Sequence, residues 1–243
     1  MKHIRSKKIC GHIKHKQVSS GRVLALLSKV IILALAVLYL QACAPALYRV
    51  DLKYEPSENL LKTAKTSSDF LVTVAMLNDI RNVDDKLQVG AVTIDGDRTP
   101  IVPKNVKVPD AVTASVREYF FKSGYRVSNN IPAWDLKEES INKDWGRILV
   151  GGNIDELKIT CDDSYLVKTY RAKVKLTLVF ANVSTKRIFD TETLESSSSL
   201  KDVSFSQEVL EARINAVLSD ALERIFTDSK LKKKIEGESM LKS

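Results

Sequence analysis

The sequence predicts an α+β domain in which a mostly antiparallel or mixed β-sheet carries two amphipathic helices on one face. Several segments alternate apolar and polar residues, as strands with one buried face do. Two other segments repeat apolar residues every three or four positions, as helices do. The expected order is two strands, a helix, a strand, a meander of three strands and a last helix, which is a two-layer arrangement.

Three short strands are predicted in the first half of the domain, at residues 69–77, 86–94 and 125–128. Each is rich in β-branched or aromatic residues and is bounded by polar ones. Residues 95–105 are expected to form a loop, because Gly96, Pro100 and Pro103 interrupt them. Residues 129–143 are polar and are also expected to form a loop.

One helix is predicted between the second and third of these strands. Asp110 is expected to cap its N-terminus. Val112, Val116 and Phe120 are spaced four apart and would form its apolar face. Gly124 is expected to end the helix in the left-handed conformation that glycine adopts without a steric penalty.

Three longer strands are predicted to form a meander at residues 146–161, 165–183 and 187–196. The second has the clearest alternation, with one face predicted to be buried and the other solvated. The polar run 196–199 is expected to end the hairpin. Gly151 and Gly152 indicate a bulge or a close backbone approach.

An amphipathic helix is predicted at residues 207–226. Its apolar stripe consists of Leu210, Ile214, Val217, Ala221 and Ile225. The charged residues 228–243 are expected to form a C-terminal tail that is at most a frayed helix.

The basic residues of the first 42 positions account for the net charge of +8. Eight lysines and arginines precede Cys43 without one acidic residue, which leaves thirty basic and thirty acidic residues in the rest of the chain. The folded part therefore has no charge excess for nucleic acid, and we expect no nucleic-acid partner.

The apolar run 30–40 follows these basic residues and is eleven residues long. A membrane-spanning helix needs roughly 20 apolar residues, so this run is more typical of the core of a secretory signal peptide. An uncleaved anchor helix formed by residues 23–40 is the alternative, and a chance cysteine after the run is a second one.

Leu40, Gln41, Ala42 and Cys43 stand at the end of the run and resemble the lipobox of bacterial lipoproteins. Gln41 departs from the small residue usual at its position. The resemblance implies a diacylglyceryl group on the Cys43 thiol, cleavage before Cys43 and an acyl chain on the new amino terminus. It implies no other cofactor. Since the next residue is Ala44 and not Asp, it also implies the periplasmic face of the outer membrane, with the inner membrane as the alternative.

This interpretation divides the chain into four parts: a signal peptide (1–42), the anchored Cys43 with a flexible tether (43–68), one α+β domain (69–227) and the charged tail (228–243). The tether would reach at most about 80 Å if fully extended. Residues 47–54 alternate loosely, and an additional edge strand is an open alternative for them.

The residues after Cys43 lack the groups that most enzymes and metal sites use. His3, His12 and His15 are the only histidines and precede the apolar run, and Cys161 is the only later cysteine. We therefore expect no enzyme and no metal site. Asp84-Asp85 and Asp162-Asp163 are interpreted as turn residues, and a carboxylate-based hydrolase as the minor alternative.

Two groups of residues are candidate binding sites. Asp79 and Arg81 follow the first strand and are expected to pair on the surface, with a ligand-binding role as the alternative. The second group is a row of basic residues: Lys158, Lys168, Arg171, Lys173 and Lys175. This row is either a solvated face neutralised by acidic residues on neighbouring strands or a patch for anionic lipid headgroups or an acidic partner.

Taken together, the lipobox and the segments VREYFFKSGYRV, LVGGNIDELKI, YRAKVKLTLVF and ALERIFTD resemble the YajG-like family of bacterial lipoproteins over about residues 70–226. The resemblance implies a small envelope lipoprotein with no established activity. It supplies no site residues beyond Cys43. The expected function is a non-enzymatic periplasmic interaction module with an unidentified envelope protein as partner. An auxiliary subunit of an envelope transport system is the alternative.

Overall fold

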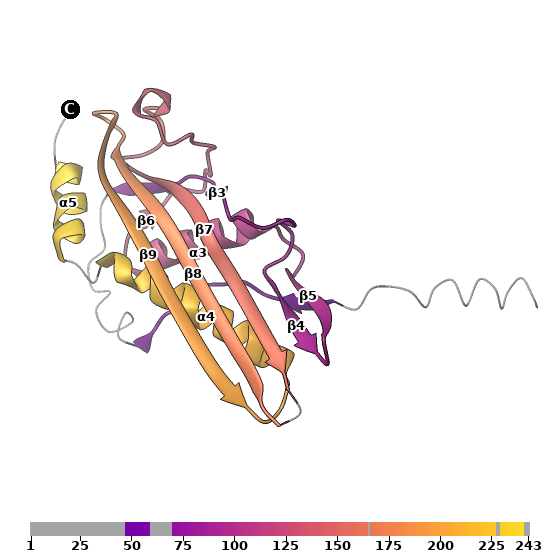
Figure 1. The fold of residues 1–243 in the computed structure, drawn as a ribbon. Helices are drawn as coiled ribbons and strands as arrows, with labels where there is room; N and C mark the ends of the chain where they lie inside the picture. Colours follow the sequence, from indigo (N-terminus) through magenta and orange to yellow (C-terminus); the bar gives the residue numbers. More distant parts are fainter. Residues whose placement is uncertain (1–46, 59–69, 165, 227–228, 241–243) are drawn as a thin grey trace, which may run out of the picture. The chain divides into compact units, whose positions relative to one another are not determined.

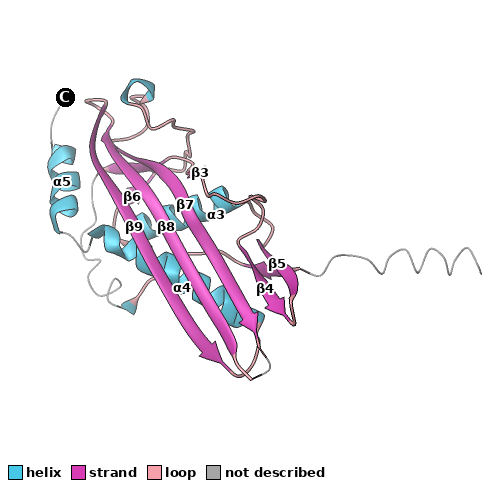
Figure 2. Cartoon of the chain, viewed as in Figure 1, coloured by secondary structure: helices cyan, strands magenta, loops and turns pink. Residues whose placement is uncertain are grey.

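Three long antiparallel strands dominate the computed structural model, which describes residues 47–58, 70–164, 166–226 and 229–240 (Figures 1 and 2). They are β7 (Ile148–Asp163), β8 (Lys168–Asn182) and β9 (Arg187–Asp202). The shorter strands are β1 (Tyr48–Val50), β2 (Leu71–Val74), β3 (Asn78–Asp79), β4 (Gly90–Ile94), β5 (Asp97–Pro103) and β6 (Arg126–Val127). The helices are α3 (Val108–Lys122), α4 (Gln207–Glu223) and α5 (Ser229–Met240), with 3₁₀ turns at Glu138–Ser140 and Arg224–Phe226.

All these strands belong to one mixed sheet. On one side, β7 pairs antiparallel with β8, which pairs antiparallel with β9. On its other side, β7 pairs in parallel with β2, β3 and β4 at successive points along its length. The sheet continues from β4 to antiparallel β5 and then to parallel β1, while β6 adds to β2. The predicted α+β class is confirmed.

The helices α3 and α4 lie on the same face of the sheet and bury the stripes predicted for them (Figure 1). Val112, Val116 and Phe120 of α3 are fully buried, and so are Leu210 and Ile214 of α4. They meet the alternate residues of β8 that the sequence predicts to face inward: Tyr170, Ala172, Val174, Leu176, Leu178 and Phe180. Local periodicity thus predicted both layers of the core.

The predicted start of α3 is wrong by three residues. The helix is capped by Lys107, without a side-chain hydrogen bond, and Asp110 lies inside its first turn. Pro109 explains the earlier start, because proline fits the first turn, where its missing N–H needs no partner. The C-terminal prediction is confirmed, since Gly124 has a φ of 91°.

The loop predicted at residues 95–105 is wrong, because it contains β5. Asp95 and Gly96 both have positive φ and join β4 to β5 in a tight hairpin, a conformation that an Asp-Gly pair favours. Similarly, β9 does not end at the serine run but continues to Asp202. There Ser196 and Ser198 lie opposite Val174 and Ala172, so cross-strand pairing outweighs the polarity of the run.

Residues 47–58, which the sequence assigns to the tether, lie in the same compact unit as the rest of the domain. They contribute β1 at the edge of the sheet, which resolves the open alternative for this segment. Val50, Leu52 and Tyr54 are buried. In the tail, α5 buries Leu231 and Ile235.

Candidate functional site

The residues proposed for lipid attachment, Leu40, Gln41, Ala42 and Cys43, lie outside the described residues. What the structure describes is the segment that follows them. It runs along α4, where polar side chains spaced four apart bind its backbone or side chains: Gln207, Glu211, Asn215, Ser219 and Glu223. Sequence reasoning missed this polar stripe, although its four-residue spacing on a helix is a readable signal.

The contacts of this stripe extend from Arg49 to Ser57, which is three quarters of the described N-terminal segment 47–58. Gln207 donates to the Arg49 carbonyl at 2.9 Å, and Glu211 accepts from the Asp51 N–H at 2.9 Å. Glu223 accepts hydrogen bonds from the Ser57 N–H at 2.7 Å and from the Tyr54 hydroxyl at 3.1 Å. Burial, followed by the nearby Glu223 charge, raises the pKa of Tyr54, so its hydroxyl stays a donor.

Asp79 and Arg81 pair as predicted, but the pair is buried and not on the surface. Their side chains are 10% and 2% exposed, and Arg81 Nη2 lies 2.7 Å from Asp79 Oδ2. Burial raises the pKa of Asp79, but the hydrogen bonds and positive charge of Arg81 outweigh it and lower the pKa overall. Little of the ion pair is exposed to solvent, although Arg81 also belongs to the lining of the cavity described below.

The remaining donors of Arg81 bind backbone carbonyls. Nη2 donates to Lys86 O at 2.8 Å, and Nη1 donates to Gln88 O at 2.9 Å and to Leu157 O at 3.4 Å. With the two bonds to Asp79, all five guanidinium N–H groups have acceptors. Arg81 therefore links the loop between β3 and β4 to β7 by hydrogen bonds. This geometry favours a structural role for Arg81 over ligand binding.

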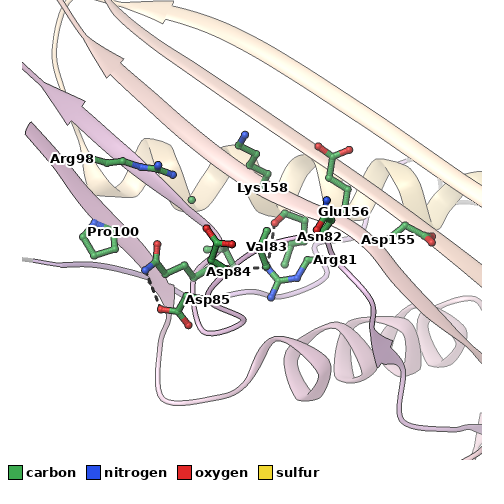
Figure 3. Close-up of a pocket in the computed structure, with 14 residues that line it drawn as sticks. Arg81, Asn82, Val83, Asp84, Asp85, Arg98, Pro100, Asp155, Glu156 and Lys158 are labelled. Atoms are coloured by element: carbon green, nitrogen blue, oxygen red, sulfur yellow. Dashed lines mark hydrogen bonds between the residues drawn. The ribbon is translucent and has the colours of Figure 1, made fainter. Parts of the chain in front are cut away.

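A cavity of about 740 Å³ lies beside this loop. Figure 3 shows Glu156 and Lys158 projecting from β7, Arg98 from β5, and Asp84 and Asp85 from the loop. Asp85 also accepts hydrogen bonds from the Leu87 N–H and the Gln88 side-chain amide, as expected of a turn residue. The lining therefore carries charges of both signs.

Four residues of the predicted basic row lie on the sheet face opposite α4. The exception is Lys168, which alternates in step with Tyr170 and Ala172 and lies at the end of the core face. Lys173 pairs with Glu156 at 2.9 Å and with Glu195 at 3.2 Å, one acid on each neighbouring strand. Arg171 pairs with Asp162, and Lys168 pairs with Asp163. Neutralisation across strands is thus found for three of the five residues. Lys158 and Lys175 belong to the same face, and Lys158 also lines the cavity.

The other half of this sheet face is covered by the loop that contains Trp134. The Trp134 ring packs over Gly151 of β7, where a Cβ would lie 2.4 Å from ring atom Cε3. Trp134 belongs to a second apolar cluster with Leu149, Val179 and Ala181. Gly152 is approached from the β8 side, and a Cβ there would lie 2.1 Å from the Thr177 carbonyl oxygen. The predicted close backbone approach is confirmed at Gly152, whereas the neighbour of Gly151 is a side chain and the bulge of β7 lies between Ile154 and Glu156.

Cys161 is fully buried in β7. Burial, followed by the nearby Asp163 charge, raises its pKa to about 11. A thiol in this state is a poor nucleophile, which agrees with the structural role expected from its acidic neighbours.

Within the described ranges, the structure contains no helix both long and apolar enough to cross a membrane. Nor do those residues hold a group of three or more His, Cys, Asp or Glu side chains arranged for a metal ion.

Comparison with known proteins shows only distant similarity. No family model matches the chain, and no curated protein matches it. Similar solved structures include a DUF330-family protein from Xanthomonas campestris, with 12% identity over 79% of this chain and 99% of that one and a TM-score of 0.49. A homologue of the neuraminyllactose-binding hemagglutinin from Helicobacter pylori has 12% identity over 79% and 96%, with a TM-score of 0.43. A minor lipoprotein from Acinetobacter baumannii has 10% identity over 67% and 94%, with a TM-score of 0.37.

Proposed function

We propose that this chain is a bacterial envelope lipoprotein, held to a membrane by acyl chains on Cys43, whose folded domain acts as a non-enzymatic interaction module in the periplasm. The observation that carries the proposal is Leu40-Gln41-Ala42-Cys43 at the end of an eleven-residue apolar run that follows eight basic residues spread over the leader. Membership of the YajG-like family is part of the same proposal and depends on the segments quoted above.

Acylation of Cys43 accounts for the order of features along the chain. A single acyl chain binds a membrane only marginally, whereas several chains on one terminus form a stable anchor. A diacylglyceryl thioether together with an acylated amino terminus supplies such a set. The positive charge and the apolar run are then needed only for export, and the charge-balanced remainder is the working protein.

The non-enzymatic part of the proposal depends on composition. The residues after Cys43 contain no histidine, and the one cysteine among them is buried with a raised pKa. Arg81 is fully occupied by structural hydrogen bonds, and the basic row is largely paired with acids. The cavity with charges of both signs and the exposed apolar side chains remain, and both suit contact with a protein or a membrane.

Metabolic labelling with a palmitate analogue tests the anchor. The wild-type chain and Cys43→Ser are compared, with Cys161→Ser as the matched control because Cys161 is buried and outside the lipobox. We expect label in the wild type and in Cys161→Ser and none in Cys43→Ser. Equal labelling of wild type and Cys43→Ser, or labelling of neither, would overturn the proposal.

A further inference from the structure

The two most exposed large apolar side chains of the described residues, Val203 and Leu166, lie at one end of the sheet. Val203 is 82% exposed and follows β9, and Leu166 is 74% exposed between β7 and β8. Ile94, the last residue of β4, is 37% exposed and lies opposite Asp163 of β7. Four adjacent strands, at about 4.8 Å each, span this edge, so the three side chains occupy about 15 Å.

The chain that leads back to Cys43 leaves the domain at this same end. β5 begins at the turn next to Ile94, and β1 runs parallel to β5 with Tyr48 opposite Ile101. The start of β1 therefore points toward the exposed apolar residues. The Tyr48 ring packs on Phe205, two residues after Val203, with ring centroids 5.1 Å apart.

Little chain separates the proposed anchor from the domain. Residues 49–57 are held on α4 by the hydrogen bonds of the polar stripe, and Tyr48 is the first residue of β1. The connection from Cys43 to the domain therefore ends at Tyr48 at the latest. Five residues lead from Cys43 to Tyr48 and span at most about 18 Å. The 25-residue tether expected from the sequence would have left the domain's orientation open, whereas this length does not.

We propose that the end of the domain carrying Ile94, Leu166 and Val203 rests on the bilayer that holds Cys43, with these side chains in its interface. This inference depends on the proposed lipid anchor. A folded protein of about 100 residues has a radius of gyration of about 13 Å, so it is wider than this connection is long. Such a partner would not fit between this end of the domain and the bilayer. The bilayer surface is therefore favoured over a protein partner as the occupant.

The charges near this end favour an apolar contact over an electrostatic one. Lys168 pairs with Asp163 and Arg171 with Asp162, so these two basic side chains are matched by acids. Asp95, Asp97 and Asp202 also lie at this end, so it presents no basic patch for anionic lipid. Burying leucine, isoleucine and valine side chains in the interface is favourable at any lipid charge. The contact should accordingly be insensitive to salt.

The test uses the full lipidated chain, purified from membranes and reconstituted into vesicles of phosphatidylethanolamine and phosphatidylglycerol. A polarity-sensitive fluorophore is attached through Val203→Cys, and in a matched variant through Phe121→Cys. Phe121 is 60% exposed, in the last turn of α3. That helix leads into β6 at the opposite end of the sheet, beside β2 and the start of β7. Both native side chains are exposed, so neither change threatens folding.

We expect a blue shift and quenching by headgroup-proximal spin-labelled lipid at position 203, unchanged by salt, and neither at position 121. With the lipid on Cys43 verified by mass, equal responses at the two positions, or none, overturn the bilayer contact and leave the anchor standing. No response at 203 together with photo-crosslinking of 203 to a protein identifies a protein-docking surface and also overturns it. Absence of lipid on Cys43 overturns both proposals.

Discussion

Asn215 binds the backbone of Lys53, because its Oδ1 accepts a hydrogen bond from the Lys53 N–H at 3.1 Å. Its Nδ2 donates to the Asp51 carbonyl at 2.9 Å, so one fully buried amide replaces the strand that this segment lacks on that side. The amide is suited to this role because it offers both a donor and an acceptor. Asn215 is central to the stripe that shortens the connection to Cys43.

Replacing Asn215 by alanine should release the N-terminal segment. The change leaves a backbone donor and a backbone acceptor without partners, at about 1–3 kcal/mol each, so we expect the free energy of unfolding to fall by about 3 kcal/mol. Amide hydrogen exchange of residues 49–57 should accelerate in the same variant. Gln207→Ala is the control, since its exposed hydrogen bond to Arg49 should contribute under about 1 kcal/mol. Equal effects of the two changes would contradict a central role for Asn215.

The Asp79–Arg81 pair should make the free energy of unfolding depend on pH in the acidic range. The pKa of Asp79 is lowered in the native state, so the unfolded state binds the proton more readily. The stability that this carboxylate contributes is therefore complete above its unfolded pKa of about 4 and is lost as the pH falls through the lower folded value.

Chemical denaturation of wild type and Asp79→Asn at several pH values measures this dependence. We expect Asp79→Asn to lower the free energy of unfolding by about 3 kcal/mol at pH 6, as loss of one partner of a buried pair does, and the difference to shrink below about pH 4. Asp84→Asn, an exposed change in the same loop, should alter it by under about 0.5 kcal/mol. A difference independent of pH would show that Asp79 is not the titrating group.

Gly151 should tolerate no side chain. A Cβ there would overlap the Trp134 ring, so we expect Gly151→Ala to displace the ring, to red-shift tryptophan emission and to lower the free energy of unfolding by about 2 kcal/mol. Gly237→Ala in α5 is the matched control, because a Cβ there meets nothing within 4 Å. It should stabilise by about 0.5–1 kcal/mol through helix propensity. Unchanged emission in Gly151→Ala would mean that the ring packs elsewhere.

The residue after Cys43 should decide the membrane. If the chain follows the sorting of Gram-negative lipoproteins that its lipobox resembles, Ala44→Asp should move it from the outer to the inner membrane. Density-gradient fractionation of cells that express each variant measures the distribution, with Ala44→Ser as the control. An unchanged distribution, with acylation intact, would argue against outer-membrane sorting by this position.

Elements with strong local periodicity could be predicted from residues alone. The alternation of β8 and the four-residue spacing of Val112, Val116 and Phe120 each record which side of an element is buried, and both are found. The turn at Asp95 and Gly96 was also readable, but Pro100 and Pro103 obscured it. Both prolines fit β5 because β1 pairs only with residues 101–103, so Pro100 has a neighbour on one side alone, and Pro103 is the last residue of the strand.

Contacts between distant parts of the chain could not be predicted in this way. The burial of Arg81 depends on the Leu157 carbonyl, 76 residues away, and the docking of residues 49–57 depends on α4, about 160 residues away. No local pattern specifies which polar stripe meets which backbone, because that choice depends on shape and hydrogen-bond complementarity after the core has formed.

The proposed mode of attachment could be predicted from residues 23–43 alone. An apolar run that ends in a small residue and a cysteine is a local pattern, so its interpretation needs no contact with the rest of the chain. The proposed closeness of the domain to the membrane, and the end proposed to face it, are argued only from tertiary features such as β1 and the polar stripe of α4. Both depend on tertiary structure, because nothing in the sequence of residues 47–58 by itself distinguishes a docked segment from a tether. The segment becomes part of the domain once a buried amide and a sheet edge satisfy its backbone.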